Sequence, residues 1–214
     1  MSRKIAVGIV DDHKLFRSGV VDIINDSKEF QVKISASNGD ELFSSLKKHP
    51  IQILLLDINL KNDENGLDIL IYLTENHPEL KVIMLTMHNE ASYINTMVLK
   101  GAKGYLMKDT TPETLLLTLQ KVHEEGKYYD SYTTNIIVES MQAKERLISL
   151  GVDLSQIEID ILRYISDGKT ADEISLLIFK STRTIEGYRQ KLLEKTKTRN
   201  IAELVSWGFK NKVL

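Results

Sequence analysis

Residues 51–57 read IQILLLD, an apolar run that ends in an aspartate. Five of the six residues before Asp57 are apolar, which is typical of a strand buried on both faces of a parallel sheet. Asp57 therefore falls where this strand leaves the sheet at its carboxyl end. Ligands bind at that edge in open α/β sheets, although an aspartate also commonly begins a turn. The rest of the chain has to decide between these two interpretations.

The first half of the chain repeats a strand followed by a helix five times. Such alternation predicts an α/β domain with parallel strands, helices on both faces and right-handed crossovers. For five units, the flavodoxin-like strand order 2-1-3-4-5 is the compact solution. The predicted strands are 4–10, 31–36, 51–57, 80–86 and 103–107, and the first helix has an apolar stripe of Leu15, Phe16, Gly19, Val20, Ile23 and Ile24.

This strand order places polar residues from four strand ends side by side, namely Asp11 with Asp12, Asp57, Thr86 and Lys108. Carboxylates that share a pocket repel one another, and a bound hard cation is the usual remedy, for which Mg²⁺ fits best. An aspartate beside such an ion can act as a nucleophile and form an aspartyl-phosphate. A lysine and a hydroxyl across the pocket would bind the phosphoryl oxygens. Alone, Asp11 and Asp12 could cap a helix, and Lys108 could be a solvated charge.

From Leu154 onward the pattern is purely helical. Ser155 with Glu158 and Thr170 with Glu173 have the spacing of capping boxes. Two short helices, a brief turn and a longer basic helix predict a helix-turn-helix within four helices. The expected organisation is an α/β domain over 1–126, a partly helical linker over 127–150, with a helix from Asn135 to Ser149, and an all-α domain over 151–214.

Composition narrows the class of protein further. The 214 residues include no cysteine, which excludes disulfides and thiolate metal sites and fits a reducing compartment. The apolar run near the N-terminus is too short for a signal peptide or a membrane span, so a cytoplasmic protein without membrane contact is expected. Residues 179–212 hold nine Lys or Arg and three Glu, a local charge of +6 against −8 for the remainder. A basic end on an acidic body suggests a polyanionic partner, although it could also be a solvated helix face.

Residues 4–126 resemble the receiver domain of bacterial two-component response regulators. The resemblance implies phosphotransfer from a sensor histidine kinase to Asp57. It also implies that Mg²⁺ is bound by Asp11, Asp12 and Asp57, with the backbone carbonyl of Asn59 as a further ligand. By the same resemblance, Thr86 and Tyr105 are the switch residues and Lys108 binds the phosphoryl group. A buried aromatic residue such as Tyr105 can also be ordinary core.

The sequence departs from the receiver pattern in the loop after Asp57. Lys61 stands where the family usually has proline, and Gly66 is displaced by one residue. The loop conformation and the dephosphorylation rate are therefore open. Asn59 and His88 stand where they could influence the access of water. Many receivers have proline after the lysine, whereas Asp109 follows Lys108 here. A Lys-Asp pair at this position is common in one DNA-binding subfamily of response regulators.

Residues 154–214 resemble the LuxR-type DNA-binding domain, in LSQIEIDIL, DGKTADEIS and STRTIEGYRQKLLEK, so the whole chain resembles a NarL/FixJ-type response regulator. The resemblance implies that the third helix enters the major groove of double-stranded DNA. There Arg183, Glu186, Gly187 and Gln190 face outward, and Gln190 could read adenine and Glu186 could accept from cytosine. The residues expected mostly to meet phosphates are Thr184, Arg189, Lys191, Lys195 and Lys197. The resemblance also implies that the last helix forms the DNA-bound homodimer, and a symmetric dimer would imply inverted half-sites. Core packing could also explain Trp207. The predicted DNA-binding residues are Arg183, Thr184, Glu186, Gly187, Arg189, Gln190, Lys191, Lys195 and Lys197, and the predicted dimer residues are Val205, Trp207 and Phe209.

Three functional hypotheses remain. The first is a transcription regulator in which phosphorylation of Asp57 favours dimers and promoter binding. The second keeps the DNA binding but makes the protein a constitutive, phosphorylation-independent dimer. The third is an aspartate-nucleophile phosphatase of the haloacid dehalogenase type, which needs an acid/base carboxylate two residues after the nucleophile. Asn59 stands there instead, so no enzyme is expected beyond self-phosphorylation and self-dephosphorylation.

Overall fold

The computed structural model describes residues 4–60, 65–87, 91–178 and 180–214. They form two compact units, with a boundary between Ile136 and Ile137. Among these residues, no helix is both long enough and apolar enough to cross a membrane. Among the described residues, the first unit has two hydrophobic cores, one on each face of its sheet, and the second unit has one.

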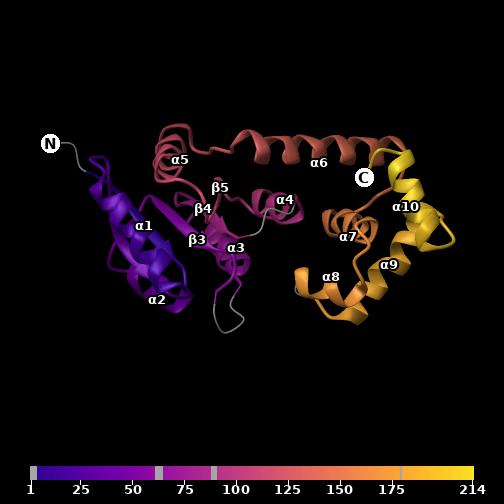
Figure 1. Cartoon of the computed structure of the whole chain (residues 1–214), viewed down its shortest axis with the longest axis horizontal. Coiled ribbons are helices and arrows are strands. Elements are labelled where there is room, and N and C mark those ends of the chain that lie inside the picture. The colour runs from indigo at the N-terminus through magenta and orange to yellow at the C-terminus, as the bar shows by residue number, and fades with distance from the viewer. Residues whose placement is uncertain (1–3, 61–64, 88–90, 179) are drawn as a thin grey trace. The chain divides into compact units, whose positions relative to one another are not determined.

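In the first unit, strands and helices alternate along the chain (Figure 1). All strand pairs are parallel, and the sheet order is β2-β1-β3-β4-β5. The predicted strand order is therefore confirmed. The elements are β1 (Ile5–Val10), α1 (Lys14–Asp26), β2 (Phe30–Ala36), α2 (Gly39–Leu46), β3 (Ile53–Asp57), α3 (Gly66–Asn76), β4 (Lys81–Thr86), α4 (Ala91–Leu99), β5 (Gly104–Met107) and α5 (Pro112–Glu125).

The central strand, β3, lies between β1 and β4, and all five of its residues are buried. Its side chains alternate between two cores. Ile53 and Leu55 face the core that α1 and α5 line, whereas Leu54 and Leu56 face the core that α2, α3 and α4 line. The sheet is thus covered on both faces, which is why this strand reads as a continuous apolar run.

The apolar stripe predicted for α1 is partly wrong. Val20 and Ile24 are buried and Phe16 packs against the core, but Leu15 is 89% exposed and Gly19 is also exposed. The helix begins at the carboxyl edge of the sheet, so its first turn extends past the strands. Within that turn, Phe16 takes the inward position and leaves Leu15 in solvent.

The helix between the two halves of the chain, α6 (Ser131–Ser149), begins before the predicted start at Asn135. A carboxylate oxygen of Asp130 accepts a hydrogen bond from the Thr133 backbone N–H at 2.7 Å and so caps the first turn. Along this helix, Ile136 belongs to a core of the first unit and Leu147 to the core of the second. The boundary between the two units therefore falls within α6.

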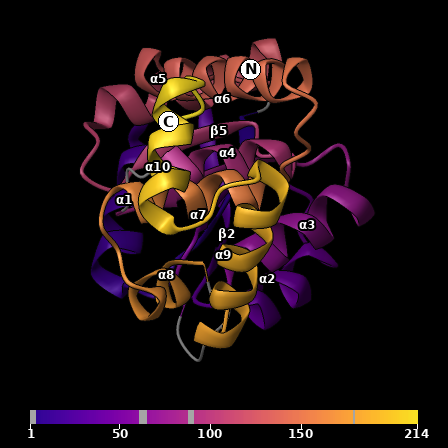
Figure 2. The same cartoon turned by 90° about the vertical axis from the view of Figure 1, so that its right-hand side faces the viewer.

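The described residues of the second unit form four further helices, drawn from orange to yellow in Figure 2. Both predicted capping boxes are present: the Glu158 carboxylate accepts from the Ser155 backbone N–H, and the Glu173 carboxylate accepts from the Thr170 backbone N–H. The core of this unit is formed by apolar side chains of these helices, and Ile161, Leu162, Ile174, Ile185, Leu192 and Leu204 are fully buried. The helices are α7 (Gln156–Ser166), α8 (Ala171–Leu177), α9 (Thr182–Thr196) and α10 (Ile201–Lys210).

Candidate functional site

The sheet brings the predicted polar residues together at the carboxyl ends of its strands. Asp57 is the last residue of β3, and Thr86 is the last residue of β4. Asp11 follows β1 directly, and Lys108 follows β5. The backbone N–H of Lys108 donates to the Thr86 carbonyl at 2.7 Å, which ties the ends of β4 and β5 together. These four residues therefore share one pocket.

The ammonium group of Lys108 bridges two buried carboxylates in this pocket. Its Nζ lies 2.6 Å from Asp57 Oδ2 and 2.8 Å from Asp11 Oδ2. Asp11 is completely buried and Asp57 is 2% exposed. The arrangement places the Asp57 carboxylate next to a fixed positive charge, out of contact with bulk water.

Burial and pairing shift the pKa values of both Asp57 and Lys108. Burial raises the pKa of the Asp57 carboxyl above its ordinary value, although the hydrogen bond and charge of Lys108 act in the opposite direction. For Lys108, burial alone would lower the pKa. Its hydrogen bonds to Asp11 and Asp57 outweigh burial, so the pKa of the ammonium group lies above its ordinary value. Lys108 therefore stays charged at neutral pH.

A divalent cation fits the acidic side of the pocket. Asp11, Asp12, His13 and Asp57 each offer one ligand atom, and these atoms lie within 4.8 Å of one another. Three of the four are carboxylate oxygens, which are the ligands that Mg²⁺ prefers. His13 was not predicted from the sequence; its Nδ1 lies 2.8 Å from Asp12 Oδ1, and its backbone N–H donates to Asp11 Oδ1.

The loop after Asp57 returns to the pocket at Gly66. The Asn59 backbone N–H donates to Asp57 Oδ1 at 3.2 Å, and Asn59 and Asn65 form an isolated antiparallel bridge. A Cβ atom on Gly66 would lie 2.1 Å from the Asp57 carbonyl oxygen. Only glycine fits this approach, so Gly66 is the residue that lets the loop close on β3. Lys61 lies outside the described residues.

Thr86 and Tyr105, the predicted switch residues, are both buried. Tyr105 pairs with Met84 in the sheet and belongs to the core that α3 and α4 line. A switching role for the two residues stays a prediction. His88, which was expected to influence water access, lies outside the described residues.

An aromatic ring that the sequence did not reveal as part of the site also lies beside Lys108. The ammonium nitrogen is 5.3 Å from the centre of the Phe16 ring, within the range of a cation–π interaction. Phe16 belongs to the first turn of α1 and was expected only as part of an apolar stripe. No spacing rule links it to Lys108, because the contact arises from the packing of α1 on the sheet.

The longest helix of the second unit, α9, presents most of the predicted DNA-binding residues to solvent. Arg189 is half-buried, and its Nη1 lies 2.9 Å from Glu186 Oε1. Gln190 donates from Nε2 to Glu194 Oε1 at 3.0 Å. The other residues of the predicted set are all at least partly exposed, namely Arg183, Thr184, Glu186, Gly187, Gln190, Lys191, Lys195 and Lys197.

Lys195, predicted to meet a phosphate, has a partner inside the unit. Its Nζ donates to Glu158 Oε2 at 2.7 Å, and the same oxygen accepts from the backbone N–H and the hydroxyl of Ser155. Burial alone would raise the pKa of Glu158, but the hydrogen bonds from Lys195 and Ser155 outweigh it and hold the pKa below its ordinary value. This carboxylate therefore joins the start of α7 to the end of α9.

We expect Glu158→Gln to destabilise the second unit by about 1–3 kcal/mol, because it weakens three hydrogen bonds to a buried charge. The folded pKa is lowered, so this stabilisation is present at neutral pH and is lost as the pH falls through the folded pKa. The difference between wild type and variant should therefore shrink in acid. Urea unfolding followed by the fluorescence of Trp207, the single tryptophan of the chain, measures it.

Glu173→Gln is the matched control, because Glu173 occupies the same capping position on α8 with a fully exposed carboxylate. We expect a smaller loss of stability from this control. Equal losses for the two variants would contradict a special role for the link between Glu158 and Lys195.

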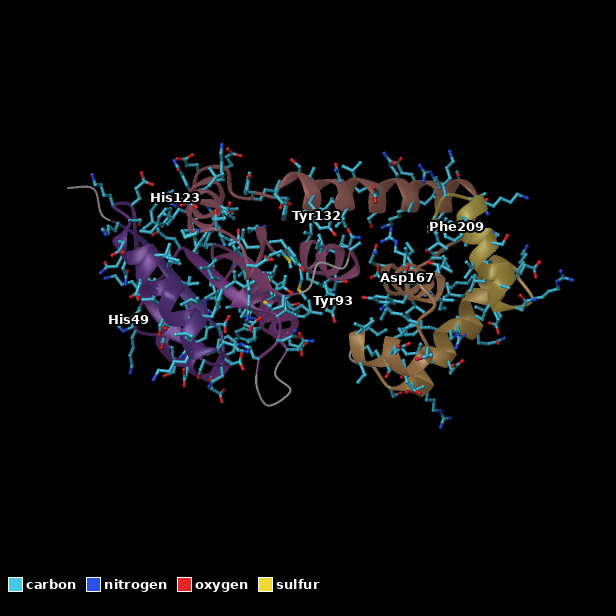
Figure 3. The ribbon with its side chains drawn as sticks, viewed as in Figure 1. His49, Tyr93, His123, Tyr132, Asp167 and Phe209 are labelled. Atoms are coloured by element: carbon cyan, nitrogen blue, oxygen red, sulfur yellow. The ribbon has the colours of Figure 1, made fainter. Side chains whose placement is uncertain are left out.

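The predicted dimer residues on α10 differ in exposure. Val205 and Trp207 are half-buried and pack against the core of the second unit, whereas Phe209 is 60% exposed (Figure 3). Of the three, Phe209 therefore offers the most surface to a second copy. Their role in dimers stays a prediction.

A five-stranded parallel sheet with a carboxylate and lysine pocket defines a receiver domain, and the helices of the second unit define a helix-turn-helix. The family model described as the response regulator receiver domain matches residues 7–120. The model of the bacterial regulatory proteins of the luxR family matches residues 152–207. The chain belongs to the response regulators of the NarL/FixJ type, and it is a DNA-binding response regulator.

Known relatives match almost the whole chain. The oxygen regulatory protein NreC of Staphylococcus epidermidis is 31% identical over 212 residues, which cover 96% of this chain and 97% of that protein. A structure of the two-component response regulator RcsB with DNA has a TM-score of 0.63 at 20% identity, covering 96% of this chain and 98% of that one. A structure of two RcsB dimers bound to two parallel DNAs has a TM-score of 0.62 at 20% identity and the same coverage. At this identity the structures show the fold alone.

Proposed function

We propose that Asp57 accepts a phosphoryl group from a sensor histidine kinase in a reaction that depends on Mg²⁺, and that this switches dimerisation and promoter binding. The observation that carries the proposal is the buried bridge of Lys108 between Asp57 and Asp11. A lysine held at this position is ready to bind the oxygens of a phosphoryl group on Asp57. A buried ion-pair cluster often adds little net stability, so its presence at this edge of the sheet favours a role in chemistry.

The reaction transfers a phosphoryl group from a histidine nitrogen of the kinase to a carboxylate oxygen of Asp57. A carboxylate oxygen of Asp57 attacks the phosphorus of a phosphohistidine, an O–P bond forms, and the N–P bond breaks. The electron pair remains on the imidazole nitrogen, which then takes up a proton. Lys108 and the Thr86 hydroxyl stabilise the negative charge on the phosphoryl oxygens during transfer.

Asp11, Asp12 and Asp57 would hold the Mg²⁺, with the Asn59 carbonyl as a further ligand. When bound, the ion supplies positive charge that offsets the charge of the carboxylates and of the incoming phosphoryl group. Asn59 stands two residues after Asp57, where a phosphatase of the haloacid dehalogenase type needs a carboxylate. We therefore propose a phosphoacceptor with at most self-phosphorylation and self-dephosphorylation activity.

In the second unit, α9 enters the major groove, and its exposed polar residues contact bases and phosphates. The basic charge of this part of the chain supplies the attraction to the DNA backbone. Phosphorylated protein forms a homodimer through α10, with inverted half-sites in the promoter. The RcsB structure with two dimers on DNA supports a dimeric binding mode for this fold.

The test is DNA affinity and mass in solution, with and without Mg²⁺ and a small phosphodonor, for wild type and Asp57→Ala. Tighter binding and dimer formation that need both Asp57 and Mg²⁺ support the switch. Equal binding under all conditions would favour the constitutive DNA-binding dimer and discard the phosphorylation mechanism.

We expect Arg183→Ala to weaken binding to a specific promoter by about 10- to 100-fold, because a solvent-accessible arginine at the start of α9 can contact a base edge. Lys191→Ala should weaken binding to all sequences alike. It should also lower the slope of log affinity against log salt concentration by about one, because one counterion fewer is released. Fluorescence anisotropy with specific and scrambled DNA at several salt concentrations separates the two effects.

Arg199→Ala removes the same charge from a side chain that is 86% exposed and paired with Glu203, outside α9, and serves as the control. It should leave the ratio of specific to scrambled affinity unchanged. If Arg183→Ala also leaves that ratio unchanged, Arg183 does not read bases.

We expect Phe16→Leu to weaken the binding of beryllofluoride, a phosphoryl analogue, by about 2- to 5-fold, which corresponds to a cation–π interaction of about 0.5–1 kcal/mol. Phe16→Trp should keep the affinity, since indole interacts at least as well with an ammonium group. Titration calorimetry with Mg²⁺ measures both. The exposed neighbour gives the control, Leu15→Ala, and a loss of affinity in Leu15→Ala as large as in Phe16→Leu would contradict the role of the ring.

A further inference from the structure

Asp11, the first residue after β1, is held through all three of its oxygen atoms. Its Oδ1 accepts the His13 backbone N–H at 2.7 Å, and its Oδ2 lies 2.8 Å from Lys108 Nζ. The third oxygen, that of the backbone carbonyl, accepts a hydrogen bond from Nη1 of Arg17. The first two contacts fix the carboxylate, whereas the contact with Arg17 fixes the backbone.

Arg17 belongs to α1 and is half-buried. Its backbone N–H donates to the His13 carbonyl at 2.9 Å, so Arg17 lies one turn into the helix. Side chains of a helix point toward its N-terminus, which directs the guanidinium back to the end of β1. In the part of the chain that the structure describes, the N-cap residue His13 makes no side-chain hydrogen bond to the first turn. Arg17 therefore supplies a side-chain link between α1 and the strand before it.

The charge of Arg17 also acts on the loop after β2. Glu41, in the first turn of α2, accepts the Ser37 backbone N–H on Oε2 at 2.7 Å. This hydrogen bond holds the pKa of the Glu41 carboxyl below its ordinary value, and the positive charge of Arg17 acts in the same direction. The Asp11 backbone N–H donates to the Ala36 carbonyl at 3.2 Å, so the two loops begin at neighbouring strand ends. Glu41 therefore provides a counter-charge for the guanidinium.

The carbonyl that Arg17 holds belongs to the peptide group between Asp11 and Asp12. Because a peptide group is planar, the direction of its C=O also sets the direction in which the chain continues to the Cα of Asp12. Asp11, Asp12 and Asp57 offer, together with His13, ligand atoms that lie within 4.8 Å of one another. Mg²⁺ demands a near-ideal octahedral geometry, so a rotation of this peptide group would move the carboxylates out of place.

We propose that Arg17 is a positioning residue of the divalent-cation site, and that its hydrogen bond to the Asp11 carbonyl makes the carboxylates of Asp11 and Asp12 converge on the ion. The inference rests on the proposed function, since it adds a residue to the Mg²⁺ site of the phosphoacceptor. Arg17 contributes no ligand atom, and its positive charge by itself repels a cation. The hydrogen bond and the charge therefore have opposite effects on Mg²⁺ affinity, which makes the two separable.

Arg17→Met removes the charge and the hydrogen-bond donors and keeps a long apolar stem. We expect it to weaken Mg²⁺ binding to the full-length protein by about tenfold, as the loss of a group that orients a metal ligand does, even though a nearby positive charge is gone. Titration calorimetry at constant ionic strength measures the affinity. Equal or tighter binding by the variant would overturn the inference and leave the proposed function intact. A wild type that binds no Mg²⁺ would overturn both.

Two further variants separate the hydrogen bond from the charge. Lys14→Met removes a positive charge from an exposed position in the first turn of the same helix, and should change Mg²⁺ affinity by less than about twofold. Arg17→Lys restores a charge and a donor, and should bind Mg²⁺ more tightly than Arg17→Met. If Lys14→Met lost as much affinity as Arg17→Met, or if Arg17→Lys bound more weakly than Arg17→Met, the inference would be wrong.

The rate of phosphate incorporation from a small phosphodonor gives a readout that a general loss of structure would not reproduce. Below the wild-type Kd for Mg²⁺, Arg17→Met should react about tenfold more slowly than wild type, because less of it carries the ion. At saturating Mg²⁺ the two rates should agree within about twofold. A deficit that persists at saturating Mg²⁺ would overturn the inference, because Arg17 would then act on the transfer or on the fold and not on the placement of the ligands.

Discussion

Asp57→Asn is expected to abolish the incorporation of phosphate from a small phosphodonor and, with it, any effect of that donor on DNA affinity. Asparagine keeps the shape of the side chain but is not a nucleophilic carboxylate. Phosphate incorporation is measured by the intact mass of the protein. Asp22→Asn, at an exposed position of α1, is the control and should incorporate phosphate as the wild type does.

The same substitution is expected to stabilise the first unit. Because burial raises the pKa of Asp57 in the folded state, its contribution to stability is present in acid and lost as the pH rises through the folded pKa. Above the folded pKa and without Mg²⁺, the ionised carboxylate therefore costs stability, and the neutral amide of the variant removes that cost while Lys108 keeps Asp11 as a partner. We expect a gain of about 1–2 kcal/mol in the free energy of unfolding, measured in urea. A loss of similar size would mean that the pairing of Asp57 with Lys108 outweighs its burial.

Gly66→Ala is expected to destabilise the first unit by more than about 2 kcal/mol and to weaken beryllofluoride binding at least tenfold. The added Cβ would lie 2.1 Å from the Asp57 carbonyl oxygen and 3.0 Å from the Ile58 Cα. Both are backbone atoms of the segment that carries Asp57, so relief of the clash has to move the pocket itself. Urea unfolding and calorimetric titration measure the two effects.

Gly19→Ala is the matched control, because nothing lies within 4 Å of the Cβ it would add in α1. There alanine should stabilise the helix by up to about 1 kcal/mol. If the two variants behaved alike, the close approach of Gly66 to β3 would have no energetic weight.

The central features of the first unit could be predicted because they follow from local pattern and topology. An apolar run ending in Asp57, in a chain where strands alternate with helices, leaves little choice of sheet order, and parallel strands bring Asp57 and Lys108 to one edge. The second unit was predictable for a similar reason, since the capping residues Ser155 and Thr170 stand directly before amphipathic segments.

What could not be predicted depends on packing between elements. The periodicity of the sequence places Leu15 on the inward face of α1. The pattern does not show that the sheet beneath the helix ends before this first turn. The contact of Phe16 with Lys108 joins residues from α1 and the end of β5 and leaves no spacing signal in the sequence. In the sequence, Gly66 stands one residue away from the usual position of this glycine in receivers. The structure gives the reason for a glycine at position 66, because a Cβ there would clash with the Asp57 carbonyl oxygen.

The β-bridge between Tyr128 and Gly104 also affects where the chain can be cut to give a receiver fragment that does not aggregate. The outer edge of β5 is a row of backbone groups that could pair with a strand of another molecule. In the intact chain, residues 128–129 cover part of that edge. A fragment cut at Gly126 uncovers it together with the apolar surface under Ile136, whereas a fragment extended through Ile136 keeps both covered. The longer fragment is therefore the better choice for expressing the receiver domain by itself.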